Sequence, residues 1–167
     1  MITTTKKSLL KIYDQYRERV NSYLDIYLSS IPSSSNSNME LKNIMKYSVL
    51  AGGKRFRPIL TYTVASLYDS EIEKADSSAS AIELIHIYSL IHDDLPAMDD
   101  DDIRHNQPAN HKVFGEAQAI LAGDGLQALA FSLISNDPLI DSDTKIKLLE
   151  LMASSSYAMA EGQSIDL

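Results

Sequence analysis

The feature that most restricts the fold of this chain is a run of aspartates placed directly behind an apolar segment. Six of the ten residues 93–102 are aspartate, and residues 81–91 before them are hydrophobic on nearly every face of a helix. That pattern predicts a helix buried inside a helical domain. Like charges repel at short range, so the run must be a solvated loop or must be neutralised by cations. Its position at the mouth of a core is unlike that of an acidic tail.

The aspartate run contains candidate ligands for a metal ion. Hard divalent cations such as Mg²⁺ prefer carboxylate oxygens and usually combine one or two of them with water and the phosphates of a substrate. On an ideal helix at about 100° per residue, Asp100 nearly coincides with Asp93, whereas Asp99 is displaced from it by roughly 240°. Pro96 forces a kink or loop between these acids, so both stay open as partners of Asp93. Taken alone, the run is equally compatible with a solvated surface.

The rest of the hydrophobic pattern predicts an all-α protein. Apolar residues recur at three- and four-residue spacing, Gly or Pro marks the ends of the segments, and no strand signal stands out. The length fits one helical domain over residues 1–167. Helices are predicted over residues 6–28, 39–50, 58–68, 75–94, 114–135 and 144–161, with a Ser- and Asn-rich loop at 33–38 and a loop from His105 to His111.

Local signals refine three of these helices. Pro58 is predicted as the first residue of the third helix. Gly123 and Gly125 weaken the fifth helix, which indicates that another helix approaches closely there. Asp143 and Thr144 are predicted to cap the last helix. Each signal is a prediction about packing or helix ends, and none implies chemistry.

Composition excludes several classes of function. The chain has no cysteine, which excludes disulfides, thiolate metal sites and a cysteine nucleophile. Its net charge of −8 argues against nucleic-acid binding, which needs a basic face. The N-terminus lacks the apolar core of a signal peptide, and no apolar run is long enough to span a bilayer. We therefore expect a cytoplasmic protein without a membrane span.

A cationic turn precedes the third predicted helix. Gly52 and Gly53 end the helix before it, and Lys54, Arg55 and Arg57 follow within four residues. Unpaired N–H groups and the helix dipole also favour an anion at such a helix start. The turn is not a nucleotide P-loop, because the first glycine and the Ser or Thr after the lysine are absent. Taken alone, the three cations favour a solvated turn over an anion site, and Arg55 is predicted to lie on the surface.

Four segments in a fixed order resemble the trans-polyprenyl diphosphate synthase family, most closely the bacterial farnesyl diphosphate synthases. They are GGKRFRP at 52–58, HIYSLIHDDLPAMDDDDIR at 86–104, FGEAQAILAGDGLQALAF at 114–131 and EGQSID at 161–166. The resemblance implies an isoprenoid-synthase-type helical bundle around a central cavity. It also implies that this chain is the N-terminal part of a larger prenyl-synthase domain, so the bundle is expected to be incomplete.

The same resemblance assigns roles to residues on both sides of that cavity. Lys54, Arg57 and His86 would bind the diphosphate of isopentenyl diphosphate. Asp93 and Asp99 would hold Mg²⁺ against the allylic diphosphate, which selects Asp99 over its neighbour by analogy. Cations for one anion and acids that recruit Mg²⁺ for another are what an enzyme joining two diphosphates requires.

Three further positions are assigned by the resemblance. Arg104 would contact the allylic diphosphate directly. The family usually continues with a second arginine and a glycine, but here His105 and Asn106 stand there. Because an imidazole is partly charged near neutral pH and makes no guanidinium fork, the contact of His105 with isopentenyl diphosphate is expected to be weaker or pH-dependent. Tyr88 would form the floor of the product pocket and limit the chain to about fifteen carbons.

The implied reaction is Mg²⁺-assisted ionisation of dimethylallyl or geranyl diphosphate, followed by attack of isopentenyl diphosphate on the carbocation. The product would be farnesyl diphosphate, and the enzyme a homodimer. One alternative is a catalytically inert prenyl-synthase-like subunit or fragment, because the family's second aspartate-rich motif is not found up to Leu167; the chain alone is expected to be inactive. A second alternative is a metal-dependent His-Asp phosphohydrolase, suggested by His86 and by the adjacent His92 and Asp93.

Overall fold

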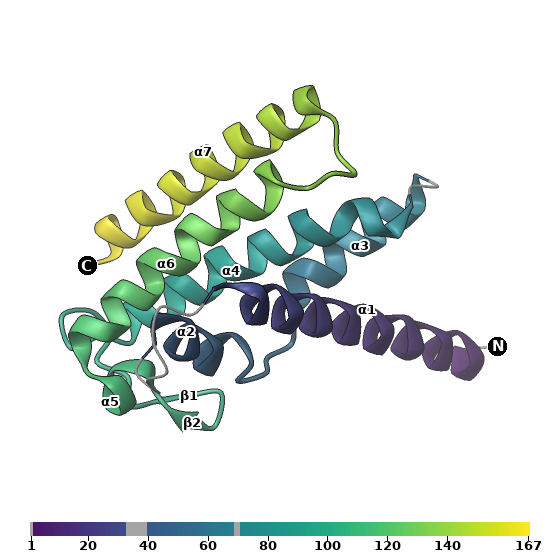
Figure 1. Ribbon diagram of the computed structural model, residues 1–167. Helices are drawn as coiled ribbons and strands as arrows, with labels where there is room; N and C mark the ends of the chain where they lie inside the picture. The colour runs from purple at the N-terminus through teal and green to yellow at the C-terminus, as the bar shows by residue number, and fades with distance from the viewer. Residues whose placement is uncertain (1, 33–39, 69–70) are drawn as a thin grey trace.

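The computed structural model describes residues 2–32, 40–68 and 71–167, and the chain they form is all-α, as predicted (Figure 1). The predicted loop at 33–38 lies outside the described residues. The elements are α1 (Ile2–Ser30), α2 (Leu41–Val49), α3 (Phe56–Leu67), the 3₁₀ helix η1 (Ile72–Ala75), α4 (Asp76–Asp93), β1 (Ile103–Arg104), β2 (Gln107–Pro108), α5 (Asn110–Phe114), α6 (Glu116–Ser135) and α7 (Ser142–Asp166).

Helices α4 and α6 lie side by side at the centre of the molecule (Figure 1). Helix α7 packs along α6, whereas α1, α2 and α3 lie on the other side of the pair. The contact face of α6 includes three alanines that are fully buried, Ala119, Ala122 and Ala130. Small side chains allow the two helix backbones to approach closely. The prediction that residues 81–91 form a buried helix is confirmed, because this segment lies within α4 at the centre of the molecule.

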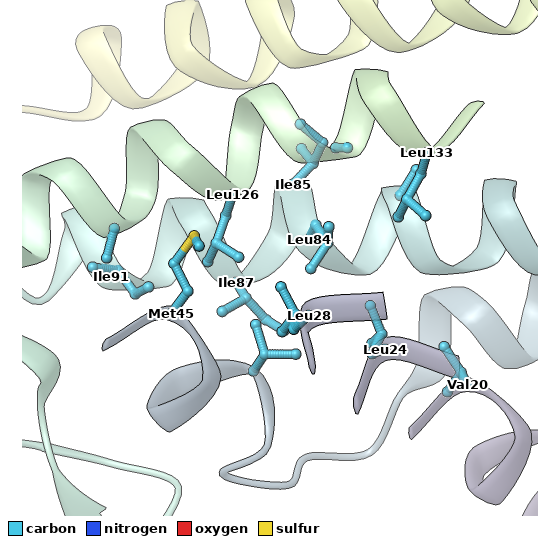
Figure 2. Packing of buried hydrophobic residues seen from close by; sticks show 14 of the residues in the cluster. Val20, Leu24, Leu28, Met45, Leu84, Ile85, Ile87, Ile91, Leu126 and Leu133 are labelled. Atoms are coloured by element: carbon cyan, nitrogen blue, oxygen red, sulfur yellow. The ribbon is translucent and has the colours of Figure 1, made fainter. Parts of the chain in front are cut away.

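The hydrophobic core forms where α1 and α2 meet this central pair (Figure 2). Val20, Leu24 and Leu28 recur every four residues along α1 and are fully buried. They face the side of α4 that carries Leu84 and Ile87. Burying one such side chain stabilises a fold by about 1.5–3 kcal/mol, so this seam holds α1 against the bundle.

The described residues include one helix, α6, that is long and apolar enough to cross a membrane. A core helix of a globular protein meets the same criteria. The buried residues of α6, among them Leu126 and Leu133, belong to the hydrophobic core, which accounts for its composition.

Gly123 marks a close approach between α6 and the end of α4, as predicted for this glycine. A Cβ atom added at Gly123 would lie 2.2 Å from Nε2 of His92. The same Nε2 donates a hydrogen bond to the carbonyl oxygen of Ile120 over 3.0 Å. The His92 ring also packs edge-on against Tyr88, with 5.1 Å between the ring centroids. The imidazole therefore occupies a notch in α6 that exists only because residue 123 has no side chain.

Replacing Gly123 with alanine is expected to lower the free energy of unfolding by about 1–3 kcal/mol, because His92 must leave this notch. The matched control is Gly162→Ala in α7, where an added Cβ meets nothing within 4 Å. There alanine is expected to stabilise by about 0.5–1 kcal/mol, through helix propensity. Urea unfolding followed by circular dichroism measures both. Equal shifts in the two variants would contradict the close approach.

The segment between α4 and α6 differs from the prediction. The expected loop from His105 to His111 is instead the turn and second strand of a short antiparallel hairpin, in which Ile103 pairs with Pro108, followed by the first residues of α5, where His111 lies. His105 and Asn106 turn this hairpin with positive φ values of 53° and 63°. Two-residue strands are too short to produce an alternating pattern, which is why no strand signal was visible.

Helix ends also differ in places. The predicted helix 114–135 is α6, which begins at Glu116 because Gly115, whose φ is 86°, separates it from the end of α5 at Phe114. Pro58 is the third residue of α3 instead of the first. The cap of α7 is Asp141, whose carboxylate accepts a hydrogen bond from the Thr144 amide, so the predicted cap at Asp143 was wrong by two residues. Helix α7 continues five residues beyond the predicted end, to Asp166.

Candidate active site

The aspartate run folds back on the end of α4. The amide of Asp99 donates a hydrogen bond to the carbonyl oxygen of Asp93 over 2.8 Å, and the amide of Asp100 donates to that of Leu95 over 3.1 Å. Pro96 lies within this turn, where the helix has already ended. The turn brings Asp99 beside Asp93. It therefore favours Asp99 over Asp100 as the second acid, a choice that helical geometry alone left open.

Asp93 is held in an environment that disfavours its negative charge. Burial raises the pKa of its carboxyl above the ordinary value, and the neighbouring charges of Asp99 and Asp94 raise it further. A cation placed between Asp93 and Asp99 would relieve this repulsion. The pair therefore fits Mg²⁺, which typically takes one or two protein carboxylates and completes its shell with water and phosphate oxygens.

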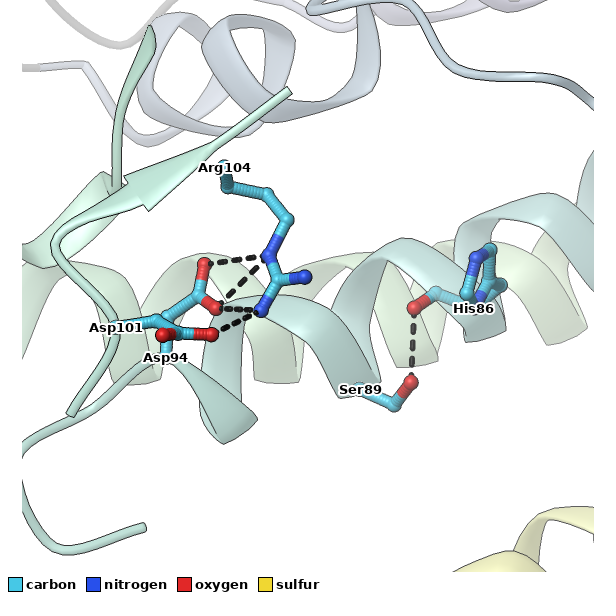
Figure 3. Close-up of polar contacts among 5 residues, drawn as sticks. All are labelled: His86, Ser89, Asp94, Asp101 and Arg104. Atoms are coloured by element: carbon cyan, nitrogen blue, oxygen red, sulfur yellow. Dashed lines mark hydrogen bonds and ion pairs between the residues drawn. The ribbon is translucent and has the colours of Figure 1, made fainter. Parts of the chain in front are cut away.

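The second aspartate of the run has a different role, which the sequence did not reveal. Asp94 is 2% exposed, and Nε of Arg104 donates to its Oδ1 over 2.9 Å (Figure 3). Nη2 of Arg104 donates to Asp94 as well and reaches Oδ2 of Asp101 over 2.9 Å. The hydrogen bond with Asp94 raises the pKa of the Arg104 guanidinium. Arg104, which is predicted to contact the diphosphate, is thus already hydrogen-bonded to the carboxylates of Asp94 and Asp101.

A cationic pocket of about 480 Å³ lies beside the glycine turn. The predicted anion-binding residues come together in it, since the turn, α4 and the hairpin each contribute side chains. An added Cβ at Gly53 would lie 3.4 Å from Cε1 of His105, so the imidazole rests against the glycine backbone. The lining residues are Ala51, Gly53, Lys54, Arg55, Phe56, Arg57, Glu83, His86, His105 and Asn106.

His86 projects from α4 into this pocket. Burial lowers the pKa of its imidazole, and the nearby positive charges of Arg57 and His105 lower it further, against the opposing effect of Glu83. The hydroxyl of Ser89 donates to the backbone carbonyl oxygen of His86 over 2.9 Å (Figure 3). This hydrogen bond uses the backbone of His86, so the ring nitrogens take no part in it.

An apolar cavity of about 640 Å³ separates α4 from α7. Its walls include Ile82, Ile85, Leu148, Leu151 and Met152. The cavity is bordered by Arg57 and His86, which also line the cationic pocket, and by Asp93 of the acidic turn. One apolar space thus adjoins both polar sites.

Tyr88 lines a neighbouring cavity of about 270 Å³, between the end of α4 and α7. Met98 and Met159 also line it. Ser89 and Asp93 border both this cavity and the larger apolar one. The predicted floor residue therefore lies next to the main cavity, on the side of the acidic turn.

The prediction that Arg55 lies on the surface was wrong. Its side chain is 2% exposed and forms an ion pair with Glu83, with 2.9 Å between Nη1 and Oε1. A backbone φ of 51° turns Arg55 inward while Lys54 and Arg57 stay exposed. A signal was present in the sequence, because Glu83 is the one carboxylate within the apolar run 81–91 and a buried carboxylate requires a partner.

The all-α bundle thus places a cationic pocket and Asp93 of the acidic turn at the border of one apolar cavity. The polyprenyl synthetase family model matches residues 38–167, so the chain belongs to the polyprenyl synthetase family.

Relatives with curated functions agree with this assignment. The chain is 44% identical to farnesyl diphosphate synthase of Haemophilus influenzae over 155 residues, covering 92% of this chain and 52% of that protein. It is 43% identical to farnesyl diphosphate synthase of Escherichia coli, covering 90% of this chain and 50% of the other. A crystal structure of a geranyltransferase from Legionella pneumophila superposes with a TM-score of 0.92 at 39% identity, covering 98% of this chain and 57% of that one. The chain thus spans about half the length of the curated relatives it matches.

Proposed function

We propose that this chain carries part of the active site of a Mg²⁺-dependent trans-prenyltransferase. The enzyme would condense isopentenyl diphosphate with dimethylallyl diphosphate to give geranyl diphosphate, and with geranyl diphosphate to give farnesyl diphosphate, releasing inorganic diphosphate at each step. The observation that carries the proposal is the shared cavity: Arg57 and His86 of the cationic pocket and Asp93 of the acidic turn border the same apolar space. We also propose that the enzyme is cytoplasmic and that it forms a homodimer. Sedimentation of the purified protein tests the dimer.

In this proposal the cationic pocket holds isopentenyl diphosphate. Lys54 and Arg57 supply permanent positive charge, and His86 and His105 supply hydrogen bonds and, when protonated, further charge. The double bond of the substrate would then extend into the apolar cavity, where the carbocation forms. Exclusion of water from this space prevents quenching of the cation.

The acidic turn would hold the allylic diphosphate. Asp93 and Asp99 would bind Mg²⁺, which neutralises the departing diphosphate when bound. Arg104 would donate to the same leaving group, stabilising the charge that develops on it. Attack of the isopentenyl double bond on the allylic carbon forms the new C–C bond, and the released diphosphate accepts the proton that is lost.

A second candidate, a prenyl-synthase-like subunit without catalysis of its own, is favoured by the state of α7. Ser156 is the one buried residue among those of α7, while apolar side chains such as Leu151 and Ile165 are 64% and 81% exposed. A cavity bounded by so loosely packed a helix admits water. We therefore keep the expectation that the 167-residue chain by itself does not transfer prenyl groups. Whether it binds diphosphates is the property to test.

The His-Asp phosphohydrolase alternative gains no support from the geometry. Within residues 2–32, 40–68 and 71–167, no three His, Asp or Glu side chains gather closely enough to hold a metal ion. His92 hydrogen-bonds to the α6 backbone, away from such a role.

The reaction itself is tested by incubating the protein with geranyl diphosphate, isopentenyl diphosphate and Mg²⁺. Liquid chromatography with mass detection should show a fifteen-carbon diphosphate that disappears when EDTA is added. Absence of product from the 167-residue chain, together with pyrophosphate binding, would select the non-catalytic candidate. Phosphate release from a nucleotide without C–C bond formation would contradict both.

Product length should depend on Tyr88. We expect Tyr88→Ala to enlarge the cavity at the end of α4, so that an active form of the enzyme makes products longer than fifteen carbons. Tyr68→Ala is the control, because Tyr68 is 77% exposed at the end of α3. Chromatography of the dephosphorylated products measures both variants. An unchanged profile in Tyr88→Ala would remove this residue from chain-length control.

Diphosphate affinity should rise as pH falls. Because burial and Arg57 lower the pKa of His86, its imidazole is neutral near pH 7, and a bound diphosphate favours the protonated form. Binding therefore takes up a proton, and affinity gains at most about tenfold per pH unit for each proton taken up. Calorimetric titration of pyrophosphate at about pH 8 and pH 6 measures the effect. The variant His86→Gln corrects for titration of pyrophosphate itself; an equal slope in that variant would contradict a role for His86.

A further inference from the structure

Arg55 uses its whole guanidinium group to tie the cationic turn to three helices. Nε donates to Oδ1 of Asn21 in α1 over 2.8 Å, and Nη1 donates to Oε1 of Glu83 in α4 over 2.9 Å. Nη2 donates to the carbonyl oxygen of Val49 at the end of α2. The side chain is thereby fixed in the interior, in contact with α1, α2 and α4.

The backbone of the turn depends on this anchor. Arg55 adopts the left-handed conformation, with φ 51° and ψ 34°, directly before α3. A non-glycine residue in that region costs about 1–3 kcal/mol and persists where surrounding contacts determine it. Its neighbours Lys54 and Arg57 are exposed and line the cationic pocket. The directions of the Lys54 and Arg57 side chains thus depend on Arg55, whose own side chain points into the interior and not toward solvent.

The anchor also balances a charge that would oppose anion binding. Glu83 lines the cationic pocket, and its side chain is 4% exposed. An unpaired carboxylate there would repel a diphosphate, but the guanidinium of Arg55 neutralises it. Glu83 lies one turn before His86 on α4, so the ion pair also joins the turn to the helix that supplies the imidazole.

We propose that Arg55 is a positioning residue for diphosphate binding: through Glu83 it fixes Lys54, Arg57 and His86 around the pocket without contacting the ligand. This inference rests on the proposed function, in which the pocket binds a diphosphate. It predicts that removing the pair lowers affinity even when the net charge of the pocket is unchanged.

The test is calorimetric titration of the 167-residue chain with inorganic pyrophosphate in the presence of EDTA, so that the acidic turn holds no metal. The main variant is the double substitution Arg55→Met with Glu83→Gln, which removes one positive and one negative charge together and leaves no buried charge unpaired. Arg55→Lys keeps the charge but not the fork, and serves if the double variant does not fold. The control is Arg19→Met, which breaks another interior ion pair, that of Arg19 with Asp76 at 2.7 Å, outside the pocket. Thermal unfolding by circular dichroism verifies that each protein is folded during titration.

We expect the double variant, or Arg55→Lys in its place, to bind pyrophosphate at least tenfold more weakly than the unmodified chain, whereas Arg19→Met loses stability and keeps its affinity. Unchanged affinity in the double variant would overturn the inference and reduce the pair to a structural contact. An equal loss of affinity in Arg19→Met would overturn it as well, because general loosening would then suffice. Absence of pyrophosphate binding in the unmodified chain would instead remove the proposed role of the pocket, and this inference with it.

Discussion

Arg104→Met is expected to lower the free energy of unfolding by about 3–5 kcal/mol, because it leaves the carboxylate of Asp94 buried without its cation. Asp94 is 2% exposed, and the guanidinium of Arg104 is its hydrogen-bonding partner through two nitrogens. Methionine fills much of the volume of arginine but carries no charge. The cost therefore reflects the unpaired carboxylate more than lost packing.

Two controls separate this explanation from a general effect of losing a cation. Adding Asp94→Asn to Arg104→Met removes the unpaired charge and should restore a large part of the lost stability. Lys112→Met breaks the exposed pair of Lys112 with Asp102, whose side chains are 40% and 73% exposed, and should cost far less stability than Arg104→Met, because solvent screens this pair. Urea unfolding at pH 7 measures all three. A loss in Arg104→Met no larger than that in Lys112→Met would contradict the buried pair.

Asp93→Asn should reduce prenyl transfer by about 100- to 1,000-fold in an active form of the enzyme, the cost of removing one group that stabilises developing charge. The substitution keeps the size of the side chain and removes the charge that would bind Mg²⁺. In the 167-residue chain, the same variant should abolish any increase in pyrophosphate affinity caused by Mg²⁺. Radiolabelled isopentenyl diphosphate measures the first effect and calorimetry the second.

Asp100→Asn is the matched control for this prediction. It removes the same charge from the same turn, and asparagine tolerates the positive φ of 53° at position 100. Because the turn places Asp99 and not Asp100 beside Asp93, activity should fall by less than about threefold, as expected for a remote, screened charge. A loss in Asp100→Asn equal to that in Asp93→Asn would mean that the whole acidic run, and no particular pair, attracts the metal.

The helices and the two polar segments were predictable because their signals are local. The four-residue spacing of Val20, Leu24 and Leu28 requires no knowledge of the partner helix, and neither do the glycines that follow α2. Lys54 and Arg57 were predicted as anion ligands, and Asp93 as a metal ligand, because cations and acids are concentrated there beside apolar runs. Ranking these residues above their charged neighbours relied on the resemblance to a family.

The charged residues that turned inward were not predictable in this way. Arg55 and Asp94 look like the exposed members of charged clusters, yet the structure buries both and pairs them with Glu83 and Arg104. Each pair joins residues at least ten positions apart, so neither partner is visible in a local window.

By itself, the sequence determined the helical class, the positions of most helices and the two stretches where opposite charges gather, since spacing and composition act within a few residues. The tertiary structure decided what residue spacing had left open: the turn places Asp99 beside Asp93, and the hairpin brings His105 against Gly53. It also decided that Arg55 turns inward and pairs with Glu83. Those outcomes depend on which segments meet in space, and a buried charge takes the partner that packing places within reach.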